Sequence, residues 1–327
     1  MKFDYIIIGA GSAGCVLSNR LSENQNNKVA VFEAGGSSDI WKVKMPLALL
    51  YTMHDPKYNW KYYSEPEPHL NNRRLFCPRG KMIGGCSAHN GMVFVRGNRN
   101  DYERWENFGL KSWSYEKVLP YFKKIETWSG GENQYRGSLG PLPVNQSKND
   151  NPLFKAFINS ASEAGHTVNP DMNGEEQEGF GMFDTTIHEG QRASATKYYL
   201  NPAKKRKNLN IFSNSFVEKI IFEGKKAIGI EVKIKNKVEK VYAEKEVILS
   251  GGSINSPQLL MLSGIGDADH LKEKGINVVN DVKGVGKNLQ DHLETYIMQE
   301  CKTPDTLYTY TKLIPKVLAG IQWFLSK

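Results

Sequence analysis

Cysteine is scarce in this chain, with four residues among 327. The four show neither C-x-x-C spacing nor histidines at the intervals of a metal site. We interpret them as free thiols in a reducing compartment, and we expect no metal ion. These cysteines are Cys15, Cys77, Cys86 and Cys301.

Long hydrophobic runs are also missing, because no apolar stretch approaches the roughly 20 residues that span a bilayer. No signal peptide is visible either, since the apolar run Tyr5–Ile8 starts a predicted strand almost at the first residue. We therefore expect a soluble, cytoplasmic protein.

Motifs for nucleic-acid binding, internal repeats and low-complexity tracts are absent as well. The formal net charge of +8 could favour an anionic surface, but the lysines are scattered. The densest basic run, Lys204–Lys207, lies between an Asn-Pro pair and an asparagine, which predicts a solvated turn. With 39% hydrophobic residues and this length, the chain is typical of a globular protein of about two domains that binds no nucleic acid.

A dinucleotide fingerprint is present at the N-terminus. The strand Tyr5–Ile8 leads into Gly9-Ala-Gly11-Ser-Ala-Gly14, a helical pattern follows, and Lys28–Phe32 predicts a second strand. Gly9 permits the tight turn, Gly11 lets the backbone approach a pyrophosphate, and Gly14 lets helix pack on strand. The start of the helix supplies N–H groups for the phosphates. We therefore include Ser12 and Ala13 among the residues that bind the dinucleotide.

Glu33 stands directly after the second strand, 19 residues beyond Gly14. A carboxylate at this place accepts hydrogen bonds from the hydroxyls of a ribose. The pattern predicts a bound dinucleotide without separating FAD from NAD, because both carry an adenosine ribose with a free 2′-hydroxyl.

The rest of the chain predicts a discontinuous α/β protein. An aromatic, irregular stretch covers residues 40–75, helical spacing covers 101–125 and 154–164, and 130–143 has the composition of a loop. Three strands are expected at Ile211–Glu223, Ala227–Lys235 and Lys240–Ser250, the last ending on Gly251-Gly252.

A second glycine patch, Gly84–Asn90, lies about fifty residues past the fingerprint and reads Gly-Gly-Cys-Ser-Ala-His-Asn. Paired glycines let the main chain approach a flavin ring, and their N–H groups with the Asn90 amide can support negative charge there. A plain turn explains the glycines equally well on composition alone.

Three blocks of this sequence resemble the glucose–methanol–choline (GMC) oxidoreductases. The first is Arg79–Gly91, the second is Gly252–Gly266, and the third is Val285–His292. The resemblance runs from residue 3 to about residue 312, and the stretch Asp291–Pro304 is most similar to choline dehydrogenases. It implies a Rossmann-like FAD-binding domain formed by residues 1–146 and 187–293, and a partial substrate domain formed by 147–186 and 294–327.

The resemblance also implies the cofactor and its ligands. FAD is expected, and choline oxidases bond it covalently to the histidine that matches His89, whereas many choline dehydrogenases have an aliphatic residue there. His89 is therefore expected either to carry the flavin or to pack beside its ring. The residues implied to bind FAD are Gly9, Gly11, Ser12, Ala13, Gly14, Glu33, Gly84, Gly85, His89, Asn90, Gly91, Met92, Val93, Val217 and Asn288.

Glu294 is the candidate for substrate binding. In an extended segment His292, Glu294 and Tyr296 share a face. A carboxylate beside an aromatic ring suits a quaternary ammonium group, and relatives that oxidise choline place a glutamate here. The alternative is a surface glutamate at the edge of a strand.

The resemblance breaks at the C-terminus. GMC enzymes keep a catalytic histidine, and a partner histidine or asparagine, near the end of a longer chain, so we expect these 327 residues to be the N-terminal part of an enzyme and inactive alone. The expected reaction is oxidation of choline to betaine aldehyde by hydride transfer to flavin N5. The acceptor would be a quinone or oxygen, and a quinone implies weak peripheral contact with the inner membrane.

Two alternatives stay open. One is the same chemistry on another primary alcohol, and the other is a non-catalytic flavin-binding subunit. The oligomeric state has no signal in the sequence.

Overall fold

The computed structural model describes residues 1–147, 151–292, 294–302 and 305–326. The chain divides into two compact units: Met1–Asn90 with Ser194–Leu293, and Gly91–Ala193 with Glu294–Lys327. The predicted domains differ from these units in the placement of residues 91–146 and 187–193. The predicted domains are a cofactor-binding and a substrate-binding domain, whereas the two units are defined by compactness alone. The division into units does not test the predicted domains, which stay a prediction.

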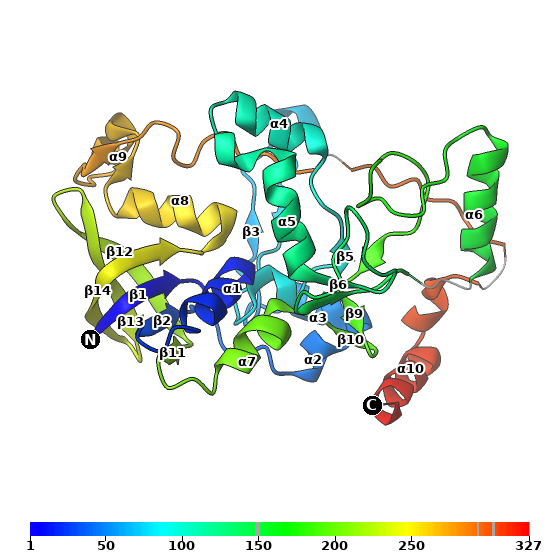
Figure 1. Cartoon of the computed structure of the whole chain (residues 1–327), viewed down its shortest axis with the longest axis horizontal. Coiled ribbons are helices and arrows are strands. Elements are labelled where there is room, and N and C mark those ends of the chain that lie inside the picture. The colour runs from blue at the N-terminus through cyan, green and yellow to red at the C-terminus, as the bar shows by residue number, and fades with distance from the viewer. Residues whose placement is uncertain (148–150, 293, 303–304, 327) are drawn as a thin grey trace. The chain divides into compact units, whose positions relative to one another are not determined.

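The first unit is built on a six-stranded sheet in the order β11-β2-β1-β14-β13-β12 (Figure 1). Strands β11, β2, β1 and β14 run parallel, while β14, β13 and β12 form an antiparallel meander. The bounds are β1 Lys2–Ile8, β2 Val29–Phe32, β11 Leu209–Phe212, β12 Ser215–Glu223, β13 Lys226–Ile234 and β14 Lys237–Leu249.

Helices cover both faces of the parallel strands, which explains why β2 is buried along its whole length. Ile7 points to the side of α1 (Ser12–Leu21), a π-helical turn at Thr196–Leu200 and α7 (Asn201–Ala203). Ile6 and Ile8 point to the other side, where α8 (Gly252–Leu262) packs (Figure 1). The expected α/β class and the β1-α1-β2 order are confirmed.

One predicted strand was wrong. Ile211–Glu223 forms two strands, because Asn214 has a left-handed φ of 51° and ends the run between β11 and β12. The parallel β11 pairs with β2, whereas β12 pairs antiparallel with β13. The basic run at 204–207 forms a turn, as expected.

The remaining elements of the first unit are short. Residues 40–75 hold small helices and the strand β3, which pairs with β4 just beyond them, rather than a further βαβ repeat, in keeping with the expected excursion. The bounds of these short elements of the first unit are α2 Trp41–Lys44, α3 Leu49–His54, β3 Tyr62–Tyr63, β4 Phe76–Cys77, β15 Ile265–Gly266, α9 Ala268–Glu273 and β16 Asn280–Asp281.

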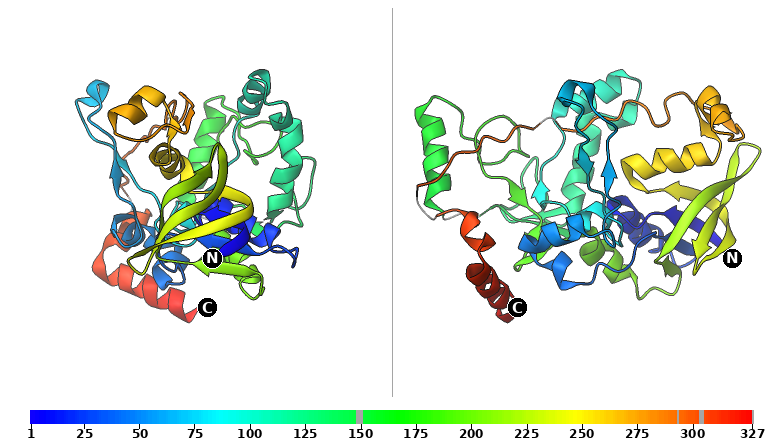
Figure 2. Two further views of the ribbon diagram at one scale, coloured as in Figure 1. Left: turned by 90° about the vertical axis from the view of Figure 1, so that its left-hand side faces the viewer. Right: turned by 180° about the vertical axis from the view of Figure 1, so that it is seen from behind.

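The second unit combines helices with short ladders (Figure 2). The predicted helical region 101–125 is two helices, because Gly109 turns the chain with a φ of 97°. Within the described residues, no helix is both long and apolar enough to cross a membrane. The bounds are β5 Val93–Phe94, α4 Arg99–Asn107, α5 Tyr115–Ile125, β6 Glu126–Trp128, β7 Leu142–Val144, α6 Pro152–Glu163, β8 Asp184–Thr185, β9 Ile187–His188, β10 Gln191–Arg192 and α10 Leu313–Leu325.

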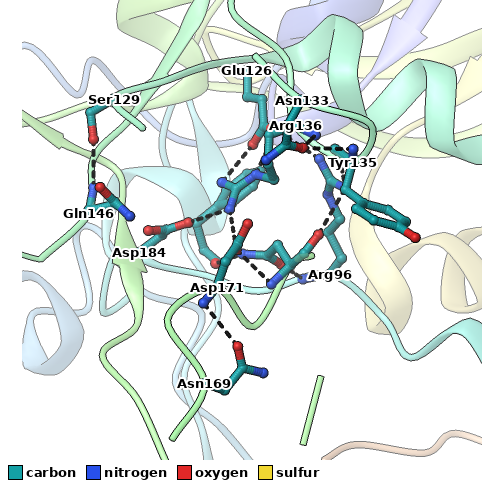
Figure 3. Close-up of polar contacts among 12 residues, drawn as sticks. Arg96, Glu126, Ser129, Asn133, Tyr135, Arg136, Gln146, Asn169, Asp171 and Asp184 are labelled. Carbon is teal, nitrogen blue, oxygen red and sulfur yellow. Dashed lines mark hydrogen bonds and ion pairs between the residues drawn. The ribbon is translucent and has the colours of Figure 1, made fainter. Parts of the chain in front are cut away.

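A buried ion network organises the second unit (Figure 3). Glu126 and Arg136 are fully buried, and two nitrogens of Arg136 donate to the Glu126 carboxylate at 3.0 and 3.1 Å. Arg96 donates to the same carboxylate at 2.8 Å, while Asp171 and Asp184 pair with Arg136 at 2.6 and 2.7 Å. Burial opposes the charge on Arg136, but these carboxylates raise its pKa overall.

Candidate dinucleotide-binding site

A cavity of about 500 Å³ opens in the first unit at the carboxyl ends of its parallel strands. Strands β1 and β14 end in register, with Ile8 beside Leu249, and β2 ends one position before Glu33. Ligands of open α/β sheets bind at this edge. The predicted site residues that line the cavity are Gly9, Gly11, Ser12, Ala13, Glu33, Gly85 and Val217.

Gly9 and Gly14 of the first glycine loop have no room for a side chain. Gly9 has a φ of 93°, and a Cβ there would lie 2.6 Å from the carbonyl oxygen of Ser250. A Cβ on Gly14 would lie 1.9 Å from the carbonyl oxygen of Gly9, so helix α1 packs directly on the strand end. Ser12 and Ala13 at the start of α1 line the cavity, and the first N–H groups of a helix are free to bind an anion.

The second glycine loop packs against the first. Gly84 and Gly85 both have positive φ angles, 96° and 49°. A Cβ on Gly85 would lie 2.8 Å from the Cα of Gly11, and the Gly84 N–H donates to the carbonyl of Ala10 at 2.7 Å. The two motifs, seventy residues apart in the sequence, thus pack main chain against main chain and form one wall.

Glu33 is the carboxylate of this wall. It is 6% exposed, and its two oxygens accept hydrogen bonds from the N–H groups of Ala10 and Gly35, each at 2.9 Å. Burial raises the pKa of Glu33, while these N–H groups and the charge of Lys81 act in the opposite direction. Each oxygen keeps a second lone pair, so the carboxylate can still accept from a ligand hydroxyl.

The far part of the cavity is apolar. Phe32, Phe216 and Val217 line it together with three leucines, Leu249, Leu259 and Leu262. Val217 is 8% exposed and belongs to β12. An apolar slot beside a polar main-chain wall has the make-up of a site for a planar base joined to a phosphate chain.

Ser250 lines the same cavity and was missed from the sequence. Its Oγ is buried and has no hydrogen-bond partner within the described part of the chain. Such a group is uncommon in a folded protein, and here it belongs to a residue that lines the cavity. The residues present therefore fit a dinucleotide cofactor, which would satisfy Ser250. The pairing of β14 with β1 places Ser250 at the cavity, and no local sequence motif indicates this position.

The other predicted ligands do not line the cavity. His89 is 4% exposed and follows the turn Gly85–Ala88, and Asn90 is exposed next to it. Asn288 is exposed in the first unit with a φ of 59°. Gly91, Met92 and Val93 belong to the second unit.

Glu294 also belongs to the second unit, in a segment that forms no strand with any described residue. It is exposed and accepts a hydrogen bond from the Tyr296 hydroxyl at 2.5 Å. That bond and the carboxylate charge raise the pKa of Tyr296. The predicted proximity of carboxylate and aromatic ring is present.

The family model described as GMC oxidoreductase matches residues 3–294. This chain belongs to that family. It is 49% identical over its full length to the oxygen-dependent choline dehydrogenase of Brucella suis biovar 1, of which it covers 59%. It is 48% identical to the mitochondrial choline dehydrogenase of Homo sapiens, with 98% of this chain and 55% of the human protein aligned. The chain thus spans less than two thirds of these relatives.

Solved GMC structures share the fold. Pyridoxine 4-oxidase from Mesorbium loti superimposes with a TM-score of 0.85 at 32% identity, covering 89% of this chain and 57% of the oxidase. Formate oxidase from Aspergillus oryzae, in a study of FAD modification, gives 0.82 at 29% identity over 89% and 52% of the two chains. The resemblance to the GMC family is confirmed.

Proposed function

We propose that this chain binds FAD in the cavity of its first unit and serves an enzyme that oxidises an alcohol, with choline as the first candidate. The observation that carries the proposal is the double glycine wall beside a buried carboxylate. The 49% identity to choline dehydrogenases supports the choice of substrate.

Several lining residues have a role in this proposal. The N–H groups at the start of α1 bind the pyrophosphate, and Gly11 and Gly85 keep the wall free of side chains. Glu33 accepts from the adenosine ribose, Val217 contacts the base, and Ser250 donates to a ribose or phosphate oxygen.

The flavin end is assigned to Gly84, His89 and Asn90. When bound, FAD supplies the acceptor at N5 for the hydride that leaves the carbinol carbon, while a base takes the hydroxyl proton. The protein's part is to hold the alcohol and to exclude water. Choline would give betaine aldehyde, and a second oxidation would give glycine betaine.

Glu294 would bind the trimethylammonium group, with Tyr296 adding cation–π attraction. In the protein as the cell makes it, Glu294→Gln should raise the KM for choline by roughly 10-fold or more, since the negative charge that pairs with the quaternary ammonium is lost. The KM for a neutral alcohol of similar size should hardly change. Tyr296→Phe is the matched control, because it removes the hydroxyl but keeps the ring. Equal effects of Glu294→Gln on both alcohols would exclude this role.

Covalent attachment of the flavin to His89 stays a prediction. Acid precipitation separates the two possibilities: a yellow pellet supports the bond, and a yellow supernatant excludes it.

The alternative substrate is another primary alcohol. The likeness to pyridoxine 4-oxidase favours including aromatic alcohols in the assay. Choline preferred over benzylic and short aliphatic alcohols supports the proposal, and the reverse order supports the alternative. Assays with oxygen and with a soluble quinone decide the acceptor, and activity that sediments with inner membranes would indicate peripheral association.

A further inference from the structure

Arg79 lines the cavity and has no role in the binding scheme so far. Its main chain is held on both sides, because its N–H donates to the Asn59 side chain at 3.1 Å and its carbonyl accepts from Trp60 at 2.9 Å. Among the described residues that line the cavity, Arg79 is the one cation and Glu33 the one carboxylate. The main chain that carries the charge is therefore fixed by the fold.

The guanidinium of Arg79 has donors to spare. Its Nε is buried without an acceptor among the described residues. The nearest acid is Asp291, with 3.9 Å between Nη2 and Oδ2, which is beyond hydrogen-bond distance. The Asp291 side chain is 80% exposed, so water weakens the pair. A planar group with five N–H donors is thus left largely uncommitted beside the cavity.

Lys81 is the other cation of this loop, and its place is different. Its ammonium lies 4.9 Å from the centre of the Trp60 ring, and its side chain does not line the cavity. The charge of Lys81 instead acts on Glu33. The phosphate end of a ligand would therefore contact Arg79, and Lys81 would stabilise the charge of the Glu33 carboxylate.

We propose that Arg79 binds the pyrophosphate of the cofactor and makes the cavity prefer ligands that carry it. This inference rests on the proposed FAD site and adds a ligand group that the glycine motif does not supply. An arginine beside a phosphate forms paired, charge-assisted hydrogen bonds that a lysine cannot reproduce. Asp291 is then a competitor for the guanidinium rather than its structural partner.

The test compares ADP with adenosine by calorimetric titration of the purified chain. ADP carries the pyrophosphate and adenosine lacks it, so their ratio isolates the phosphate contribution. Arg79→Gln should weaken the binding of ADP by about 10- to 100-fold and leave the affinity for adenosine unchanged. Arg79→Lys should recover part of the loss. Asp291→Asn should leave ADP binding unchanged or tighten it.

Arg74→Gln is the matched control, because this exposed arginine of the same segment donates to the Ser64 carbonyl and does not line the cavity. It should leave both ligands unaffected. An unchanged ADP affinity in Arg79→Gln would overturn the inference, as would equal losses for ADP and adenosine or an Asp291→Asn variant that copies the loss. A wild-type chain that binds neither ADP nor FAD refutes the proposed function as well, whereas FAD binding that ignores Arg79 refutes the inference alone.

Discussion

The cavity of the first unit and the ion network of the second both bury charge, but they treat it differently. In the network, Arg136 meets the carboxylates of Glu126, Asp171 and Asp184 within hydrogen-bond distance. In the cavity, Glu33 forms no salt bridge with any described residue and is held by two backbone N–H groups. In the network each buried charge thus faces an opposite charge, whereas the cavity keeps charged and polar groups without a close counter-charge among the described residues, which a ligand can satisfy.

This contrast explains why the most heavily charged buried cluster is not the candidate site. Paired buried charges fix a local structure, and the ring of Trp128 covers the Arg136 guanidinium at 4.2 Å. Unused lone pairs and donors next to empty space point to binding instead. The comparison can be tested by breaking each region and measuring both stability and ligand affinity.

The largest effect is expected in the network. Glu126→Gln removes the charge that Arg96 and Arg136 share and should lower the free energy of unfolding by about 3–5 kcal/mol. Chemical denaturation measures this. Glu103→Gln, which breaks the exposed pair with Arg99, should cost about 0–1 kcal/mol. The ADP affinity of the folded Glu126→Gln chain should stay unchanged. A large loss of ADP affinity would contradict the conclusion that the network stabilises the fold and the cavity binds the ligand.

The next effect is expected in the first glycine loop. Gly14→Ala forces a methyl group against the Gly9 carbonyl, which should cost about 1–3 kcal/mol of stability and displace the start of α1. ADP affinity should fall with it. The control is Gly284→Ala in the same unit, where a Cβ would meet nothing within 4 Å. Equal behaviour of the two variants would show that close packing at Gly14 does not matter.

A smaller effect is expected at Glu33, with a defined pH dependence. Burial raises its pKa in the folded chain, so above about pH 4.3 the folded state keeps a proton that the unfolded state has released. The free energy of unfolding should therefore fall as the pH rises through that range. Glu33→Gln removes this fall, and urea denaturation across the range measures it.

Glu33→Gln should also weaken ADP binding at pH 7 by roughly 10-fold, because one of the two acceptor oxygens is replaced by an NH₂ donor. Glu65→Gln, an exposed neighbour in the same unit, is the control. A variant that keeps both the pH slope and the affinity would remove Glu33 from the site.

The smallest effect concerns two thiols. Burial raises the pKa of Cys15 to about 12, so its thiol should not react with an alkylating reagent in the folded chain. Cys86 is half-buried and lines the cavity, so ADP or FAD should slow its alkylation several-fold. Mass spectrometry of the labelled peptides reads both sites. Reaction of Cys86 at the same rate with saturating FAD would place the ligand elsewhere.

Local signals in the sequence were enough for the centre of the fold. The strand, glycine turn, helix and second strand up to Glu33 follow from hydrophobic patterning and from glycines whose Cβ atoms would collide. The break at Asn214 was missed although Ser213-Asn214-Ser215 is a polar run that favours a turn, because apolar residues continue on both sides of it.

The missing parts of the site depend on contacts between distant segments. Ser250 reaches the cavity through the pairing of β14 with β1, and Arg79 through the bridge between Asn59 and Gly80. Ser250 stands in no short motif, and Arg79 opens the block Arg79–Gly91 without any local signal that its side chain lines a cavity. Asn288 is the opposite case, a predicted ligand that does not line the cavity. It lies in the block Val285–His292 that resembles the family, but its side chain is exposed and away from the cavity lining.

The most direct test of the account is the flavin content and FAD titration of the purified, folded chain. We predict saturable binding of one FAD per chain that ADP competes away, with Gly14→Ala impaired. A chain that is folded by circular dichroism yet binds neither FAD nor ADP would contradict the assignment of this cavity.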